Sequence, residues 1–195
     1  MLKAHLLMQL VGRLRQMATA NMLKAKQTGF SLIEVLIVVF IIGITAAVAI
    51  PSYRIWIQNT KVRTAAESIQ NGIQKARSEA LMRNTPVQFT LGANSAWTVQ
   101  CVNAAACPDL TGGVVETRSN QEGDTSAVTI VATPGGATDI VFTNLGIKST
   151  TVANQLTQVD VSVTDANRNL SITIGAGGNV RVCDPNASAT DPRKC

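Results

Sequence analysis

The sequence predicts an α+β fold in which one long amino-terminal helix packs on a small antiparallel β domain. Three observations lead to this prediction. Residues 30–50 form an apolar stretch, residues 52–84 show the three-and-four spacing of an amphipathic helix, and the residues after 86 alternate in short runs between turn residues. With 195 residues, the chain has room for one domain with a core and one additional element, rather than for two full domains.

The apolar stretch from Phe30 to Ile50 has the length of a membrane helix. Its 21 residues would rise about 31 Å, which matches a hydrocarbon core of roughly 30 Å. The 29 residues before it carry five basic residues and no acidic one, so the positive-inside rule keeps them in the cytoplasm and makes the residues after Pro51 exoplasmic. Beyond Gly29, 12 basic residues balance 12 acidic ones. The overall charge of +5 therefore gives no argument for a nucleic-acid partner.

Glu34 is the only ionisable side chain of this apolar stretch. A secretory signal peptide has a shorter apolar region, although Ala47-Val48-Ala49 offers a cleavage site for that class. A plain single-pass anchor has the right length, but a carboxylate inside it costs about 2 to 3 kcal/mol. Neither interpretation explains why the charge is kept, and its presence predicts a partner for Glu34.

The residues around Glu34 resemble the processing site of type IV prepilins. The match is Gly29-Phe30-Ser31-Leu32-Ile33-Glu34-Val35. The resemblance implies that a prepilin peptidase cuts after Gly29, that Phe30 becomes N-methylated and that Pro51 kinks the helix. It also implies that Glu34 pairs with the α-amino group of a neighbouring subunit, which would relieve the cost of an unpaired carboxylate in apolar surroundings. Gly29 and Phe30 are thus the predicted processing residues, and Glu34 and Pro51 the predicted assembly residues.

Residues 1–29 are predicted to be the prepilin leader. At 29 residues it is longer than the short basic leaders of this class. Met22 offers an alternative start, because residues 22–29 form a compact basic leader. The sequence leaves both starts open.

The helix is predicted to continue as an amphipathic segment over residues 52–84 and to end before Pro86, which disfavours a helical conformation in the preceding residue. Its packed face is Val62, Ala66, Ile69, Ile73, Ala76 and Ala80, and its opposite, solvated face holds Arg54, Lys61, Arg63, Lys75, Arg77 and Arg83 with Glu67 and Glu79.

The end of this helix resembles the helix-to-strand junction of the GspH/FimT family. The matching residues are Ala76-Arg77-Ser78-Glu79-Ala80 and Arg83-Asn84-Thr85-Pro86-Val87. Two later segments, residues 142–146 and 178–183, resemble further landmarks of that family. The family includes the FimT and FimU minor pilins and the minor pseudopilin of type II secretion, so the resemblance implies a type IV pilin-like fold.

Residues 85–195 are predicted to form the β domain. The expected strands are 87–91, 97–102, 127–132, 139–142, 158–163, 169–174 and 179–182. Residues 112–124 are expected to form a loop or an irregular strand pair, and Gly135-Gly136 and Gly177-Gly178 mark turns.

Four cysteines in an exoplasmic domain are better explained by disulfide bonds than by free thiols. Three pairings are open, of which Cys101 with Cys107 and Cys183 with Cys195 is the most local. A zinc site is the rival interpretation, but the spacing contains no CxxC pair and the only histidine, His5, lies in the leader. No metal and no cofactor are therefore expected.

The carboxyl-terminal tail carries the candidate DNA-binding residues. FimT-like members of the family are implicated in DNA uptake through a basic motif near the terminal cysteine. This chain departs from that motif, because Asn179 stands in place of its first arginine. Arg181, Arg193 and Lys194 remain as candidates, and three cationic contacts predict only weak, salt-sensitive affinity for double-stranded DNA.

Together these observations predict a minor type IV pilin that takes part in pilus assembly and priming, with a pseudopilin of a type II secretion system as the alternative. An enzyme is not expected, because the sequence offers no nucleophile-base pair, metal cluster or phosphate loop. The expected partners are other pilins and the prepilin peptidase. The expected location is the bacterial inner membrane, with a periplasmic carboxyl-terminal domain, and afterwards the filament.

Overall fold

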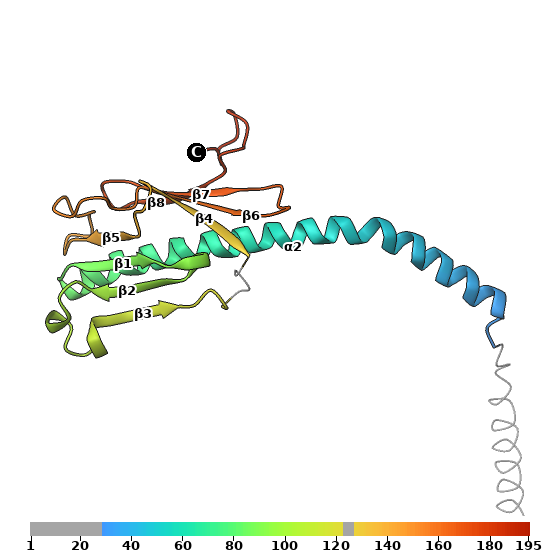
Figure 1. The fold of residues 1–195 in the computed structure, drawn as a ribbon, viewed down its shortest axis with the longest axis horizontal. Coiled ribbons are helices and arrows are strands. Elements are labelled where there is room, and N and C mark those ends of the chain that lie inside the picture. Colours follow the sequence, from blue (N-terminus) through green and yellow to red (C-terminus); the bar gives the residue numbers. More distant parts are fainter. Residues whose placement is uncertain (1–28, 123–126) are drawn as a thin grey trace, which may run out of the picture. The chain divides into compact units, whose positions relative to one another are not determined.

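The computed structural model describes residues 29–122 and 127–195 (Figure 1). Residues 1–28 of the predicted leader, with the alternative start at Met22, lie outside the described residues. The chain divides into two compact units at Ala47 and Val48, and helix α2 (Leu32–Arg83) contributes to both.

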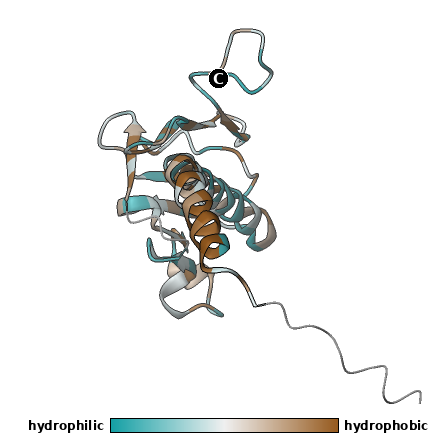
Figure 2. Ribbon diagram, turned by 90° about the vertical axis from the view of Figure 1, so that its right-hand side faces the viewer, coloured by the Kyte–Doolittle hydropathy of each residue, from teal (hydrophilic) through white to brown (hydrophobic). Residues whose placement is uncertain are grey.

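In the first unit, α2 is apolar around most of its surface and is largely brown in Figure 2, with Glu34 as its only charged residue. Ser31 precedes the helix, and its carbonyl accepts hydrogen bonds from the Glu34 and Val35 amides. The only hydroxyl in the part of the helix that belongs to this unit, that of Thr45, donates back to the carbonyls of Ile41 and Ile42, each at 3.0 Å. Such a bond hides the polar atom and allows the segment to lie in apolar surroundings.

In the second unit, one face of α2 packs against two antiparallel sheets. The first sheet has the order β3-β2-β1-β5 and the second has the order β4-β6-β7-β8. Their strands are β1 (Val87–Leu91), β2 (Trp97–Cys101), β3 (Val114–Arg118), β4 (Val128–Thr133), β5 (Asp139–Phe142), β6 (Gln158–Val163), β7 (Leu170–Ile174) and β8 (Val180–Cys183). The predicted α+β architecture is confirmed.

The predicted helix face is the centre of the core. All six of its residues are fully buried, together with Ala65. Small residues on this face allow a close approach of the first sheet, since a Cβ on Gly72 would lie 2.7 Å from the Phe89 ring and 2.8 Å from the Trp97 ring. The Trp97 indole nitrogen donates to the Ser68 hydroxyl at 3.0 Å, so the buried ring leaves no polar atom unpaired.

Two features differ from the sequence prediction. Residues 112–124, expected to be a loop or an irregular pair, include a single strand, β3, which pairs with β2 through a bulge at Val99 and Gln100. The polar face of the helix was predicted to be solvated, yet Glu79 is only 5% exposed. The reason for this burial is the ion-pair network described below.

The α2 helix ends at Arg83, one residue before the predicted end. Asn84 follows with a left-handed φ of 51°, a conformation that asparagine tolerates better than most residues. Its side-chain oxygen accepts a hydrogen bond from the Asn144 amide at 3.1 Å, which connects the helix end to the turn after β5.

Candidate assembly segment and carboxyl-terminal tail

The predicted processing junction lies in extended backbone ahead of the helix. Gly29 and Phe30 are outside any regular element, and Phe30 is 82% exposed. A Cβ placed on Gly29 would meet no atom within 4 Å. The peptide bond between the two residues is thus sterically open among the described residues, as an enzyme that cleaves it would require.

Glu34 lies in the first turn of α2, where the positive end of the helix dipole favours a carboxylate. Ser31 and Glu34 have the spacing of a capping box, but neither side chain makes the capping hydrogen bonds within the part of the chain that is described. Ile33 and Val35, the sequence neighbours of Glu34, are 61% and 51% exposed. The Glu34 carboxylate forms no ion pair with a described residue, so the described part of the chain offers its charge no counterion.

The helix that contains Glu34 is the one described helix long and apolar enough to cross a membrane. Most of its large side chains from Phe30 to Ile50 are exposed by about half or more. Because such side chains gain about 1.5–3 kcal/mol each when removed from water, this surface requires lipid or other protein around it.

The two later sequence landmarks meet at one point on α2. Arg77 donates from Nε to the carbonyl oxygen of Gly146 at 2.9 Å. Gly178 packs on the same carbonyl, and a Cβ there would overlap it and lie 3.2 Å from the Arg77 Nε. Gly178 has a left-handed φ of 78° and Gly146 has one of 68°. A Cβ on Gly146 would lie 3.0 Å from the Leu81 side chain. Both glycines are thus required by conformation and by close packing.

An ion-pair network around the buried Glu79 fixes the other end of the helix. Glu79 pairs with Lys75 at 3.2 Å and with Arg83 at 2.7 Å. Arg83 also donates to both carboxylate oxygens of Asp109 at 2.8 Å, just beyond the disulfide-closed loop of Cys101 and Cys107. Burial would raise the pKa of Glu79, but the hydrogen bonds from Arg83 and Lys75 outweigh it and lower that pKa. The charge of Glu79 is therefore kept in the folded protein.

The tail folds back along β8 and is closed by a disulfide bond between Cys183 and Cys195. Arg181 donates from one guanidinium nitrogen to the carbonyls of Pro192 and Lys194, each at 2.9 Å. The Asp184 amide donates to the Arg193 carbonyl at 2.7 Å. The disulfide and these three hydrogen bonds hold the polar tail in place.

The structure brings the three candidate DNA-binding residues together, but two of them already have partners. Arg181 holds tail carbonyls, as above. Arg193 donates from Nε and from a terminal nitrogen to the two carboxylate oxygens of Asp191, at 3.0 and 2.7 Å. These bonds lower the Asp191 pKa to about 2. Of the three side chains, only that of Lys194 has neither a hydrogen bond nor an ion pair with the described part of the chain. DNA phosphates would have to compete for both arginines.

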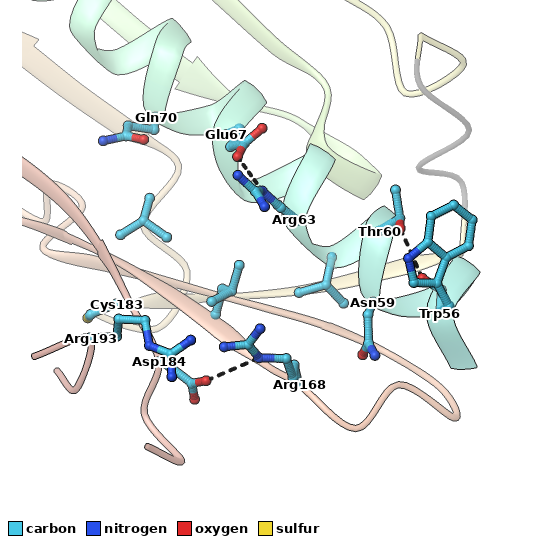
Figure 3. A pocket seen from close by; sticks show the side chains of 13 residues that line it. Trp56, Asn59, Thr60, Arg63, Glu67, Gln70, Arg168, Cys183, Asp184 and Arg193 are labelled. Carbon is cyan, nitrogen blue, oxygen red and sulfur yellow. Dashed lines mark hydrogen bonds and ion pairs between the residues drawn. The ribbon is translucent and has the colours of Figure 1, made fainter. Parts of the chain in front are cut away.

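A cleft of about 550 Å³ lies between α2 and the tail (Figure 3). Val62, Leu170 and Val182 contribute apolar side chains to it. Its charged residues form pairs: Arg63 with Glu67 at 2.7 Å, Arg168 with Asp184 at 3.6 Å, and Arg193 with Asp191 beyond its edge at 2.7 Å. Because each guanidinium already faces a carboxylate, the cleft presents no excess charge to an anionic ligand.

Sequence reasoning missed the contacts of Arg168 and Asp184 at this cleft and the role of Gln155. The Gln155 side chain accepts from the Val141 amide at 2.8 Å and donates to the carbonyls of Ser149 and Val152 at 2.7 Å, which covers the outer edge of β5. These partners are distant in sequence or follow no periodic pattern, so no local signal could have identified them.

Comparison with curated proteins finds relatives that match a short part of the chain. A fimbrial protein of Pseudomonas aeruginosa is 39% identical over 61 residues, which are 31% of this chain and 39% of that protein. The type IV major fimbrial protein FimA of Dichelobacter nodosus is 48% identical over 52 residues, 27% of this chain and 32% of FimA. The matches thus span about a third to two-fifths of these relatives.

Two solved structures are similar at low sequence identity. The type IV minor pilin FimU of Pseudomonas aeruginosa matches with a TM-score of 0.47 and 14% identity, over 65% of this chain and 93% of FimU. The minor pseudopilin EpsH from the type 2 secretion system of Vibrio cholerae matches with a TM-score of 0.47 and 11% identity, over 65% of this chain and 99% of EpsH.

Family comparison covers most of the chain in two parts. Residues 24–50 match the prokaryotic N-terminal methylation motif, which includes the predicted processing site and Glu34. Residues 65–190 match the family described as type II transport protein GspH, from the packed half of α2 through all eight strands into the tail. The chain therefore belongs to the GspH family of minor type IV pilins and pseudopilins.

Proposed function

We propose that this chain is a minor type IV pilin, made as a membrane-held precursor, cut between Gly29 and Phe30, and incorporated in a pilus where it takes part in assembly and priming. The observation that carries the proposal is Glu34. It is a carboxylate without an ion-pair partner among the described residues, on a helix whose residues 32–50 are otherwise without charge and almost all exposed.

The cut at Gly29 and the charge of Glu34 explain each other. Cleavage creates an α-amino group at Phe30, directly ahead of the helix. In a bundle of such helices, the amino group of one subunit pairs with the Glu34 carboxylate of the next. Both charges then leave water together, which avoids the cost of burying either one alone. Because each subunit offers one amine and one carboxylate, the pair also fixes the register of neighbouring helices.

Intact mass and amino-terminal sequencing test the processing step. The membrane-extracted protein is compared between cells with and without prepilin peptidase. We expect a chain that begins at N-methylated Phe30 only where the peptidase is present. A chain that begins at Ile50, or one left uncut in both strains, would contradict the proposal and indicate a secreted or singly anchored β domain.

A minor pseudopilin of a type II secretion system is the second candidate function. It is supported by the GspH family match, because the family takes its name from type II transport. The two candidates use the same helix and assembly chemistry, so the test must be made in the cell. If the chain is a pilus subunit, its deletion reduces piliation, and the chain is detectable in pili sheared from the parent strain. Deletion of a pseudopilin instead stops export of the secreted enzymes.

DNA binding by the tail has weaker support than filament assembly. Arg181 and Arg193 already have hydrogen-bond partners inside the tail, and the charge of Asp191 offsets that of Arg193. A gel-shift assay at low salt compares the parent with a variant in which Arg181, Arg193 and Lys194 are all alanine. DNA uptake by this surface requires a shift that is lost in the variant and weakened by added salt.

A further inference from the structure

A stacked aromatic pair lies directly after the membrane-length stretch of α2. Tyr53 and Trp56 are three residues apart and occupy one side of the helix. Their ring centroids are 5.7 Å apart with an interplanar angle of 25°. The residues are 60% and 61% exposed. Burial of aromatic rings this large is a major source of stability, so an exposed stacked pair indicates a partner outside the folded chain.

We propose that Tyr53 and Trp56 bind the lipid headgroup layer and set the depth at which the membrane-held chain lies in the bilayer. The proposal rests on the membrane-held state of the proposed function and adds the residues that contact lipid. At about 1.5 Å per residue, Tyr53 lies roughly 5 Å and Trp56 roughly 9 Å along the helix beyond Ile50. The polar layer of a bilayer leaflet is about 5–8 Å thick, so Tyr53 falls within it and Trp56 at its outer edge, from which a helical side chain leans back toward the amino-terminal end.

The chemistry of the two side chains matches this layer. An interfacial tyrosine or tryptophan places its ring beside the acyl chains and its polar atom among the headgroups. Neither the Tyr53 hydroxyl nor the Trp56 indole nitrogen forms a hydrogen bond with a described residue. Arg54, between them in sequence, is exposed and carries a positive charge that lipid phosphates attract.

The second tryptophan of the chain shows what Trp56 lacks. Trp97 is 4% exposed, packs near Phe89 and donates its indole hydrogen to Ser68. Its environment is complete within the protein. Trp56 has an aromatic neighbour, but neither burial nor a hydrogen-bond acceptor within the described chain. The headgroup layer would supply both.

Quenching by brominated lipids tests the proposal on the full chain. The protein is reconstituted in vesicles of phosphatidylethanolamine and phosphatidylglycerol whose acyl chains are brominated near the headgroup end or near the methyl end. Tryptophan emission is measured for the parent and for Trp56→Phe, an exposed conservative substitution that leaves Trp97 as the only tryptophan. We expect bromines near the headgroup to remove most of the emission that Trp56 contributes, and deep bromines to remove less of it. Trp56→Phe should lose this lipid-sensitive emission.

Three outcomes would overturn the inference. Equal emission with and without bromine, in a chain that floats with the vesicles, would show that Trp56 contacts no lipid and would indicate a protein partner such as another pilin. Stronger quenching by deep bromines would place Trp56 in the hydrocarbon core. A chain that does not float with the vesicles would refute the membrane-held state of the proposed function as well.

Discussion

Gly178→Ala is expected to destabilise the carboxyl-terminal domain by about 3 to 5 kcal/mol. Gly178 has a left-handed φ of 78°, a conformation that costs a residue with a Cβ about 1–2 kcal/mol. The new methyl group would also overlap the Gly146 carbonyl and lie 3.2 Å from both the Arg77 Nε and the Phe142 ring. Loss of the hydrogen bond between Arg77 and Gly146 adds about 1.5–3 kcal/mol, because its donor is charged.

Gly136→Ala provides the matched control. Gly136 has nearly the same φ, 79°, but a Cβ there would meet no atom within 4 Å. It should cost only the conformational part, about 1–2 kcal/mol. Urea unfolding of the full chain in detergent measures both variants, with Trp97 as the reporter in a Trp56→Phe background. With an m-value of about 2 kcal/mol per molar, Gly178→Ala should lower the midpoint by roughly 2 M. Equal losses in the two variants would refute the packing argument and leave backbone conformation as the whole effect.

Three further predictions concern assembly and the tail. Glu34→Ala should strongly reduce recovery of the chain in sheared filaments while its membrane level stays normal. The control Glu67→Ala, which removes an exposed carboxylate of the same helix, should leave recovery unchanged. Normal recovery of the Glu34→Ala variant would count against pairing of Glu34 with a neighbour. The hydrogen bonds from Arg193 lower the Asp191 pKa from 3.8 to about 2, so the stabilisation of the tail by this pair is complete above about pH 4 and is lost as the pH falls through 2. Amide exchange of Arg193 should follow that titration, and an unchanged exchange rate in Asp191→Asn would show that the pair does not hold the tail. Cys195→Ser should make the tail sensitive to trypsin while the β domain resists it, and a tail that stays resistant would mean that the hydrogen bonds of Arg181 suffice.

The sequence was most informative where one physical pattern repeats. The three-and-four spacing predicted the buried face of α2 residue by residue, because a helix places such residues on one side whatever they contact. Alternation predicted seven of the strands within about one residue at either end. It missed β3, an edge strand whose side chains are mostly exposed and whose residues therefore show no apolar alternation. The pattern reports burial, and a strand without burial lacks the signal.

The candidate site was less predictable from sequence. Glu34 could be recognised without any knowledge of the fold, because a lone carboxylate in an apolar stretch is unusual. The tail residues were different. Arg181 was predicted to be available for phosphates, but in the structure it donates to two carbonyls that only the folded tail brings near. Glu79 was predicted to be solvated, but it is buried and pairs with Lys75 and Arg83, and Arg83 also binds Asp109, which lies 26 residues further along the chain. Counting charges cannot show which of them already have partners.

The landmark residues and the exposed apolar residues near the end of α2 carry different kinds of information. The residues that resemble family landmarks, Arg77, Gly146 and Gly178, meet in a close contact inside the folded domain. They report on the fold, so a match to residues 65–190 cannot by itself separate a pilus subunit from a secretion subunit. That distinction must depend on residues that the fold leaves free to vary. Exposed apolar side chains such as Met82 and Leu145, 70% and 69% exposed near the end of α2, are of this kind. Their substitution should alter the choice of neighbouring subunit without changing the stability of the domain, whereas substitution of the landmarks should do the reverse.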